Sequence, residues 1–222
     1  MTDWLGRRKY ARYPIVIPAL YGLNGAEPAM AGSGWTRDLS EGGLCLELPD
    51  RLEVSALIHL FLRTDQGGIS IEGQVIWAEG PLPTGGVLHG VAFTPTVSGQ
   101  HRAVQDLLLR KRMVWQAVVR IPLELPVTYQ LKSQPRSFHQ GQTENVSRRG
   151  LLLRLPLVYS PGTSLEVALH TPHGHLTAEG MIVRVEPLEA QTLGEPIRHG
   201  FHFTDISHAA QMALGRVLAE AR

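Results

Sequence analysis

A cluster of basic side chains near the amino terminus has the composition of an anion-binding segment. Residues 7–12 read RRKYAR, so four cations and one aromatic ring lie within six residues. The planar guanidinium of arginine binds phosphate through paired hydrogen bonds and stacks on flat rings. The segment could therefore hold a ligand that carries phosphate and aromatic groups. The alternative interpretation is a solvated basic arm that binds nothing.

A second polar motif lies between two apolar runs. Asp38, Ser40, Gly42 and Gly43 belong to the sequence DLSEGG at 38–43. Such residues favour a tight turn, because short polar side chains bond to the local backbone and glycine tolerates unusual backbone angles. The turn would present acceptor oxygens and let a ligand approach the backbone. An ordinary Asx-type turn without a ligand is the alternative.

The chain contains an internal repeat. This repeat defines the domains whose strands and turns position the two motifs. Four blocks recur in the same order at offsets of 107 to 110 residues. The matched blocks are RYPIVIP (12–18) with RIPLELP (120–126), DLSEGGL (38–44) with NVSRRGL (145–151), GQVIW (73–77) with GMIVR (180–184), and HGVAFT (89–94) with HGFHFT (199–204). We interpret the chain as a tandem duplication with predicted domains at 1–112 and 113–222.

Each half shows the pattern of a small β-rich domain, in which short aliphatic and β-branched runs alternate with turn residues. The 23 Gly and 15 Pro residues favour many strands and turns over a helical bundle. The first half predicts strands near 15–21, 30–39, 43–48, 57–63, 69–79 and 87–95, then a helix near 100–115 with Ser98 as its N-cap. Asp205 or Ser207 would cap the final helix of the second half. The predicted fold is mainly β, with two small antiparallel barrels of about six strands, each closed by a C-terminal α-helix.

The second half keeps part of the polar pattern. Arg120, Asn145, Ser147 and Gly150 repeat the order of an arginine followed by a polar turn. Four residues before this arginine, where the first half has another arginine, the second half has Gln116 in an apolar segment. Losing one charge-assisted hydrogen bond, worth roughly 1.5–3 kcal/mol, weakens binding about tenfold to over a hundredfold. We predict a degenerate, weak second site.

Two further polar clusters of the second half are interpreted as ordinary surface. Arg148 and Arg149 lie in the turn of the degenerate motif, where they either are solvated, compensate in part for the missing arginine or reach a partner. His170, His173 and His175 fall within six residues and have donor atoms suited to zinc or nickel. No cysteine or closely spaced carboxylate accompanies them, so we expect an exposed turn and no physiological metal.

Taken together, the motifs of the first half resemble those of the PilZ domain family. They are Arg8-x-x-x-Arg12 and, some 25 residues later, Asp38-x-Ser40-x-x-Gly43, and the blocks GQVIW and GVAF also fit. The resemblance covers the whole first half and, more weakly, the second. PilZ domains are bacterial receptors for the second messenger cyclic di-GMP (c-di-GMP), so the resemblance implies this ligand and no cofactor.

The chemistry of c-di-GMP agrees with these side chains. Each guanine offers O6 and N7 acceptors that match an arginine fork, and N–H donors that suit a carboxylate. We expect the arginines to bind guanine edges and phosphates, Asp38 and Ser40 to bond to the ligand, and Gly43 to keep the turn compact. A single ligand and an intercalated ligand dimer, which Arg7 would permit, both remain open. The predicted ligand-binding residues are Arg7, Arg8, Arg12, Asp38, Ser40 and Gly43.

Composition argues against several other classes of protein. Lys and Arg number 21 against 20 Asp and Glu, a net charge of +1, so we expect no DNA or RNA partner. The single cysteine, Cys45, the absence of a signal-peptide pattern and the absence of a long apolar run predict a cytoplasmic protein without membrane insertion. Hydrolase-elbow, P-loop and zincin motifs are missing, which argues against an enzyme.

The leading hypothesis is a c-di-GMP receptor that changes conformation on binding and passes the signal to an unidentified protein partner. The family resemblance suggests control of motility, pili, exopolysaccharide or biofilm. The alternative is a ligand-independent protein-interaction module, which the presence of Arg8, Arg12, Asp38 and Ser40 disfavours. A nucleic-acid-binding barrel ranks last, because aromatic residues make up only 6% of the chain and such proteins stack bases on exposed aromatics.

Overall fold

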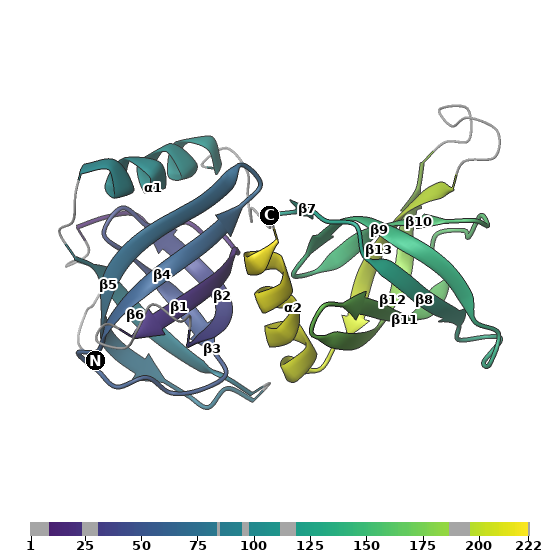
Figure 1. Ribbon diagram of the computed structural model, residues 1–222, viewed down its shortest axis with the longest axis horizontal. Helices are drawn as coiled ribbons and strands as arrows, with labels where there is room; N and C mark the ends of the chain where they lie inside the picture. Colours follow the sequence, from purple (N-terminus) through teal and green to yellow (C-terminus); the bar gives the residue numbers. More distant parts are fainter. Residues whose placement is uncertain are drawn as a thin grey trace. The chain divides into compact units, whose positions relative to one another are not determined.

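The computed structural model describes residues 9–23, 31–83, 85–94, 98–111, 119–186 and 196–221, and only the backbone at 98–100 and 111. The chain divides into two compact units, Met1–Val119 (unit 1) and Arg120–Arg222 (unit 2). Figure 1 shows a small β-barrel in each unit. The part of the expected helix near 100–115 that follows residue 111 lies outside the described residues.

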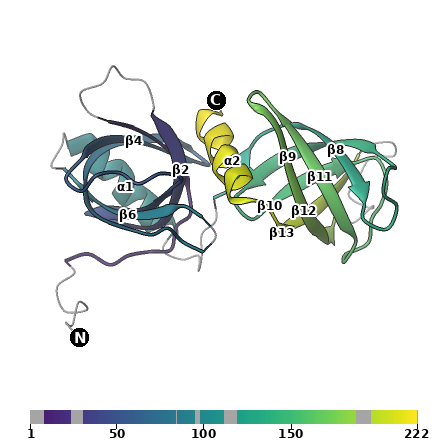
Figure 2. The ribbon, with the colours of Figure 1, turned by 90° about the horizontal axis from the view of Figure 1, so that it is seen from below.

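Unit 1 is a closed antiparallel barrel with strand order β1-β2-β3-β6-β5-β4, and pairing of β1 with β4 closes the ring. Its elements are β1 (Pro18–Leu23), β2 (Gly32–Ser40), β3 (Gly43–Leu48), β4 (Leu57–Thr64), β5 (Gly67–Glu79), β6 (Val87–Phe93) and α1 (Ser98–Lys111). Figures 1 and 2 show α1 lying across one end of the ring, where its Val104, Leu107 and Leu108 are buried.

The core of unit 1 follows from the two-residue period of its strands. Along β4 the buried positions alternate with more exposed ones, and Ile58, Leu60 and Leu62 point into the barrel with no exposed surface. Trp35 of β2 is also fully buried. Alternation of this kind places one face of each strand in the core and the other toward solvent.

The first strand starts later than the sequence predicts. The expected strand near 15–21 is observed as β1 from Pro18, because a side chain replaces the ladder before it. The hydroxyl of Thr36 donates to the carbonyl of Ile15 (2.7 Å) and accepts from the N–H of Ile17 (2.8 Å). Upstream of this, Tyr13 forms an isolated bridge with Leu39, which ties the arm before the barrel to β2.

Unit 2 repeats the barrel. Its elements are β7 (Ile121–Pro122), β8 (Pro126–Leu131), β9 (His139–Ser147), β10 (Gly150–Leu155), β11 (Ser164–Thr171), β12 (Gly174–Val185), β13 (Ile197–Asp205) and α2 (His208–Glu220). The order β10-β13-β12-β11-β8-β9 closes through pairing of β9 with β10, and the two-residue β7 adds to β9. The predicted fold class, two six-stranded antiparallel barrels each followed by a helix, is confirmed.

The final helix begins where one of the two expected caps predicts. Ser207 is the N-cap of α2, and its hydroxyl accepts a hydrogen bond from the N–H of Ala210 (3.1 Å). Asp205, the other candidate, is the last residue of β13. A serine in extended conformation satisfies a backbone donor that the first turn of a helix leaves unpaired.

The duplication extends to buried polar contacts. The hydroxyl of Thr143 donates to the carbonyl of Leu123 (2.6 Å) and accepts from the N–H of Leu125 (2.8 Å), as Thr36 does in unit 1. His89 and His199 are both fully buried. Their Nε2 atoms accept from the N–H groups of Leu52 (3.0 Å) and Tyr159 (3.1 Å). Burial lowers the pKa of each imidazole, so both are neutral acceptors at pH 7.

These two histidines should make both units sensitive to mild acid. In the unfolded chain the imidazoles titrate near the ordinary value of about 6.5, and in the folded units below it, so unfolding takes up protons as the pH falls through this window. We therefore expect the melting temperature to fall between pH 7.5 and 5.5. NMR titration of the imidazole carbon-bound protons tests the cause, and midpoints at or above 6.5 for both rings would refute it.

Candidate functional site

Arg12 and Asp38 form an ion pair on the outside of unit 1. Nη1 of Arg12 lies 3.1 Å from Oδ1 and 3.5 Å from Oδ2 of Asp38, and the two side chains are 27% and 29% exposed. The bridge between the neighbouring residues Tyr13 and Leu39 brings the two together. A guanidinium has five N–H donors, and this contact uses Nη1 alone. The pair thus presents further donors and carboxylate lone pairs to a ligand.

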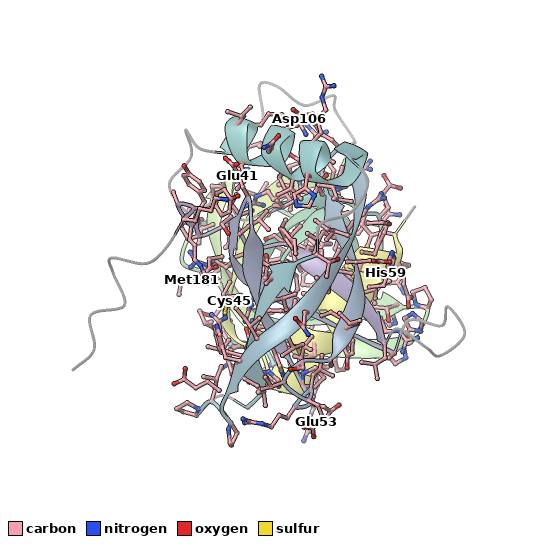
Figure 3. The ribbon with its side chains drawn as sticks, turned by 90° about the vertical axis from the view of Figure 1, so that its left-hand side faces the viewer. Glu41, Cys45, Glu53, His59, Asp106 and Met181 are labelled. Carbon is pink, nitrogen blue, oxygen red and sulfur yellow. The ribbon has the colours of Figure 1, made fainter. Side chains whose placement is uncertain are left out.

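The turn between β2 and β3 is closed by its own serine. Oγ of Ser40 donates to the carbonyl of Gly43 (2.9 Å), which leaves its two lone pairs as acceptors. Gly43 must be glycine, because a Cβ there would overlap the carbonyl oxygen of Val91 in β6. Glu41 in the same turn accepts from Nε2 of Gln105 in α1 (3.4 Å). Figure 3 shows Glu41 and Cys45 on one side of the barrel.

A cavity of about 200 Å³ adjoins this turn and combines cationic, aromatic and apolar walls. Its lining residues are Lys9, Tyr10, Arg12, Ser40, Gly42, Gly43, Ile76, Val91 and Ala92. The ring of Tyr10 lies over Gly42, where a Cβ would come within 2.7 Å of it, and Nζ of Lys9 lies 5.3 Å from the ring centroid. Of the predicted site residues, Arg7 and Arg8 lie outside the described residues.

Trp77 completes this face, and the sequence interpretation gave it no role in binding. Asp38, Cys45, Gly90 and Trp77 are direct partners on the four adjacent strands β2, β3, β6 and β5. The half-buried indole lies over Gly90, where a Cβ would overlap its nitrogen. A flat ring therefore lies in one cross-strand row with the carboxylate that pairs with Arg12.

Two β-bulges bring this row to the outer surface. The register shifts between Thr36 and Asp38 in β2, and between Val75 and Trp77 in β5. Thr36 and Val75 are buried in the barrel, so a regular strand would turn the residues two positions later inward as well. Each bulge inserts one residue and reverses the facing of the residues after it. In the sequence, Asp38 was predicted as a site residue, whereas Trp77 and Gly90 were recognised only as members of the repeated blocks GQVIW and HGVAFT.

Unit 2 reproduces the site geometry with an amide in place of the carboxylate. Nη1 of Arg120 donates to Oδ1 of Asn145 (3.2 Å), and Oγ of Ser147 donates to the carbonyl of Gly150 (3.0 Å). A Cβ at Gly150 would overlap the carbonyl oxygen of Phe201. The structure therefore brings together the residues of the predicted weak second site, although Gln116 lies outside the described part of the chain.

Other polar groups singled out by the sequence have structural partners. Arg148 is buried rather than solvated, and its Nη2 donates to Oε1 of Gln211 in α2 (3.0 Å). His170 contacts the hydroxyl of Thr128 (2.7 Å), and His173 contacts Glu220 (2.5 Å). Within the described residues, no group of three or more His, Cys, Asp or Glu side chains could hold a metal ion. Burial first, then the charge of Asp38, raises the pKa of Cys45 to about 11, so its thiol is protonated at neutral pH.

Comparison with known families agrees with this geometry. A model of the PilZ domain matches residues 6–110 and again 116–220. The chain belongs to the PilZ domain family. Each unit is thus a PilZ domain. The Arg12–Asp38 pair and the Arg120–Asn145 pair lie in corresponding parts of the two matched segments. No curated protein matches the chain. Among the described residues, no helix is both long and apolar enough to cross a membrane.

Several solved structures are similar to this chain at low sequence identity. The inhibitor of motility MotI/DgrA of Bacillus subtilis is 12% identical, with a TM-score of 0.39, over 93% of this chain and 95% of that one. PlzA of Borreliella burgdorferi, solved in complex with c-di-GMP, is 13% identical, with a TM-score of 0.42, over 94% and 88%. MrkH, described as a c-di-GMP-dependent transcription regulatory factor, is 10% identical, with a TM-score of 0.36, over 91% and 83%.

Proposed function

We propose that this tandem PilZ protein is a non-enzymatic receptor for c-di-GMP and that unit 1 carries the binding site. The observation that carries the proposal is the joint position of the Arg12–Asp38 ion pair and the cavity beside Ser40 and Gly43. Membership of the PilZ family supports it. The Tyr10 and Trp77 rings on the same face add flat surfaces of the kind that stack on nucleobases.

The roles of the side chains follow from their free hydrogen-bonding groups. The unused donors of Arg12 bind the O6 and N7 acceptors of a guanine or a phosphate oxygen. Asp38 holds Arg12 in place and accepts from the guanine N–H donors, and Ser40 offers its lone pairs. Arg7 and Arg8 precede Arg12 closely enough in the chain to add cations to the same ligand.

The proposed output is a conformational change read by a protein partner. In the described part of the arm, the backbone beside Arg12 meets β2 through the bridge of Tyr13 with Leu39, ahead of the Thr36 contacts to Ile15 and Ile17. A bound ligand therefore has few backbone contacts to overcome in repositioning Arg12. We propose that the protein controls motility, pili, exopolysaccharide or biofilm.

We also propose a cytoplasmic location and no DNA or RNA partner. A fluorescence-anisotropy titration with duplex DNA at physiological salt tests the absence of a DNA partner, and we expect no change in anisotropy.

Calorimetry with two cyclic dinucleotides tests the proposal. We expect saturable binding of c-di-GMP at micromolar concentration or below, and binding of cyclic di-AMP at least about a hundredfold weaker. Adenine has no O6 acceptor and no N1–H donor for these groups, and a site built to bond such groups rejects a base that lacks them. Absence of heat with c-di-GMP would favour the ligand-independent interaction module instead.

A further inference from the structure

In unit 2 an arginine takes the place of the Trp77 indole. Asn145, Leu152, Gly200 and Arg184 are direct partners on β9, β10, β13 and β12, in the row that Asp38, Cys45, Gly90 and Trp77 form in unit 1. The stem of Arg184 crosses Gly200, where a Cβ would lie 2.6 Å from its Cγ and 3.0 Å from its Nε. The stem of this exposed side chain therefore lies across the sheet over β13, on the same outer row as Asn145.

This arrangement sets two guanidinium groups on one face of unit 2. Partial burial lowers the pKa of Arg120, and the positive charge of Arg184 lowers it further. Arginine nevertheless keeps its charge at neutral pH, so the two like charges repel each other. Arg120 has the amide of Asn145 as its partner, where Arg12 in unit 1 has a carboxylate.

The nearby carboxylates do not neutralise the pair. Glu144, next to Asn145 in the chain, lies 2.7 Å from Arg198, and Glu124 lies 3.5 Å from Arg154. Among the described residues of unit 2, no carboxylate forms an ion pair with Arg184. The Arg184 stem lies over Gly200, and its exposed guanidinium is close enough to Arg120 for the two charges to interact. Two accessible guanidinium groups on one face without a counter-charge suit the binding of a phosphate.

We propose that unit 2 binds the phosphate group of a small ligand between Arg120 and Arg184. Oδ1 of Asn145 accepts from Arg120, which turns the Nδ2 donor of the amide toward the same anion. With neither a carboxylate for guanine N–H groups nor an indole for stacking, this face recognises phosphate and not the base. The proposal does not depend on c-di-GMP binding in unit 1, because it involves other residues and another chemical group.

NMR titration of the ¹⁵N-labelled full chain with inorganic phosphate and with 5′-GMP, at constant ionic strength, tests this. We expect saturable shifts of the Gly200 amide, the Asn145 side-chain amide and the Arg184 Nε–H signal. Tighter binding of 5′-GMP would indicate a nucleotide phosphate, and equal binding a phosphate group alone; both support the proposal. No saturable shift at Gly200 with either ligand would overturn it, whatever happens at Trp77 with c-di-GMP.

Three variants separate a binding site from a structural arginine. Arg184→Gln should weaken phosphate binding at least tenfold without lowering the melting temperature, because it removes a repulsion. Asn145→Asp should weaken it similarly by supplying the carboxylate that unit 1 has. Arg216→Gln, which removes an exposed arginine paired with Glu220 (2.9 Å), should bind as the wild type does. Unchanged affinity in Arg184→Gln, or equal losses in Arg184→Gln and Arg216→Gln, would refute the site.

Discussion

Replacing Arg12 with alanine is expected to weaken c-di-GMP binding about tenfold to a hundredfold or more. The change removes a charge-assisted contact worth roughly 1.5–3 kcal/mol and leaves Asp38, 29% exposed, without the cation that holds it. Arg12→Lys should give an intermediate loss, since an ammonium keeps the charge but not the planar fork. Isothermal titration calorimetry measures all three affinities.

The matched control for this prediction is Arg120→Ala. Arg120 occupies the corresponding position in unit 2, with Asn145 as its partner, so its removal takes the same side chain from the repeated motif. We expect c-di-GMP to bind this variant with the wild-type affinity. If Arg12→Ala binds like the wild type, or if Arg120→Ala loses binding equally, the ligand site is not where we propose.

Gly43→Ala is expected to destabilise unit 1 and to weaken its ligand binding together. The new Cβ would overlap the carbonyl oxygen of Val91, a backbone atom that cannot move without disturbing the pairing of β3 with β6. Overpacking of this kind costs about 1–3 kcal/mol or more, which for a domain of this size lowers the melting temperature by several degrees. Thermal unfolding followed by circular dichroism measures the loss.

Gly42→Ala, one residue earlier, should separate binding from stability. Its Cβ would meet the ring of Tyr10 at 2.7 Å, and that side chain can rotate away. We expect a change in stability within about 0.5 kcal/mol, and c-di-GMP binding several-fold weaker, because the displaced ring lines the cavity. Wild-type stability of Gly43→Ala would show that β3 and β6 do not approach each other as closely as described.

The repeat made most of the fold predictable from the sequence. Matching blocks at offsets of 107 to 110 residues predicted two similar barrels, and the ends of the predicted strands lie within three residues of those observed in unit 1. The first strand was misplaced because the hydroxyl of Thr36 donates to the carbonyl of Ile15 and accepts from the N–H of Ile17, where a strand ladder would use backbone groups. The strand propensity of a segment does not show that a side chain from another strand will take the place of its backbone hydrogen bonds.

The outer row of each unit could not be predicted from a two-residue period. Bulges before Asp38 and Trp77 reverse the facing of both side chains, and shifts in the corresponding strands of unit 2 do the same for Asn145 and Arg184. Strict alternation assigns such residues to the core face. The exchange of Trp77 for Arg184 was visible in the sequence, but its neighbours across the sheet were not.

The most direct test of the account is an NMR titration of the ¹⁵N-labelled full chain with c-di-GMP. Saturable shifts should appear at the Trp77 indole N–H, at Arg12 Nε–H and at the amides of the turn from Ser40 to Gly43, with the corresponding signals of unit 2 changing less or at higher ligand concentration. Saturable binding that shifts only unit 2, or no saturable shift on this face of unit 1, would contradict it.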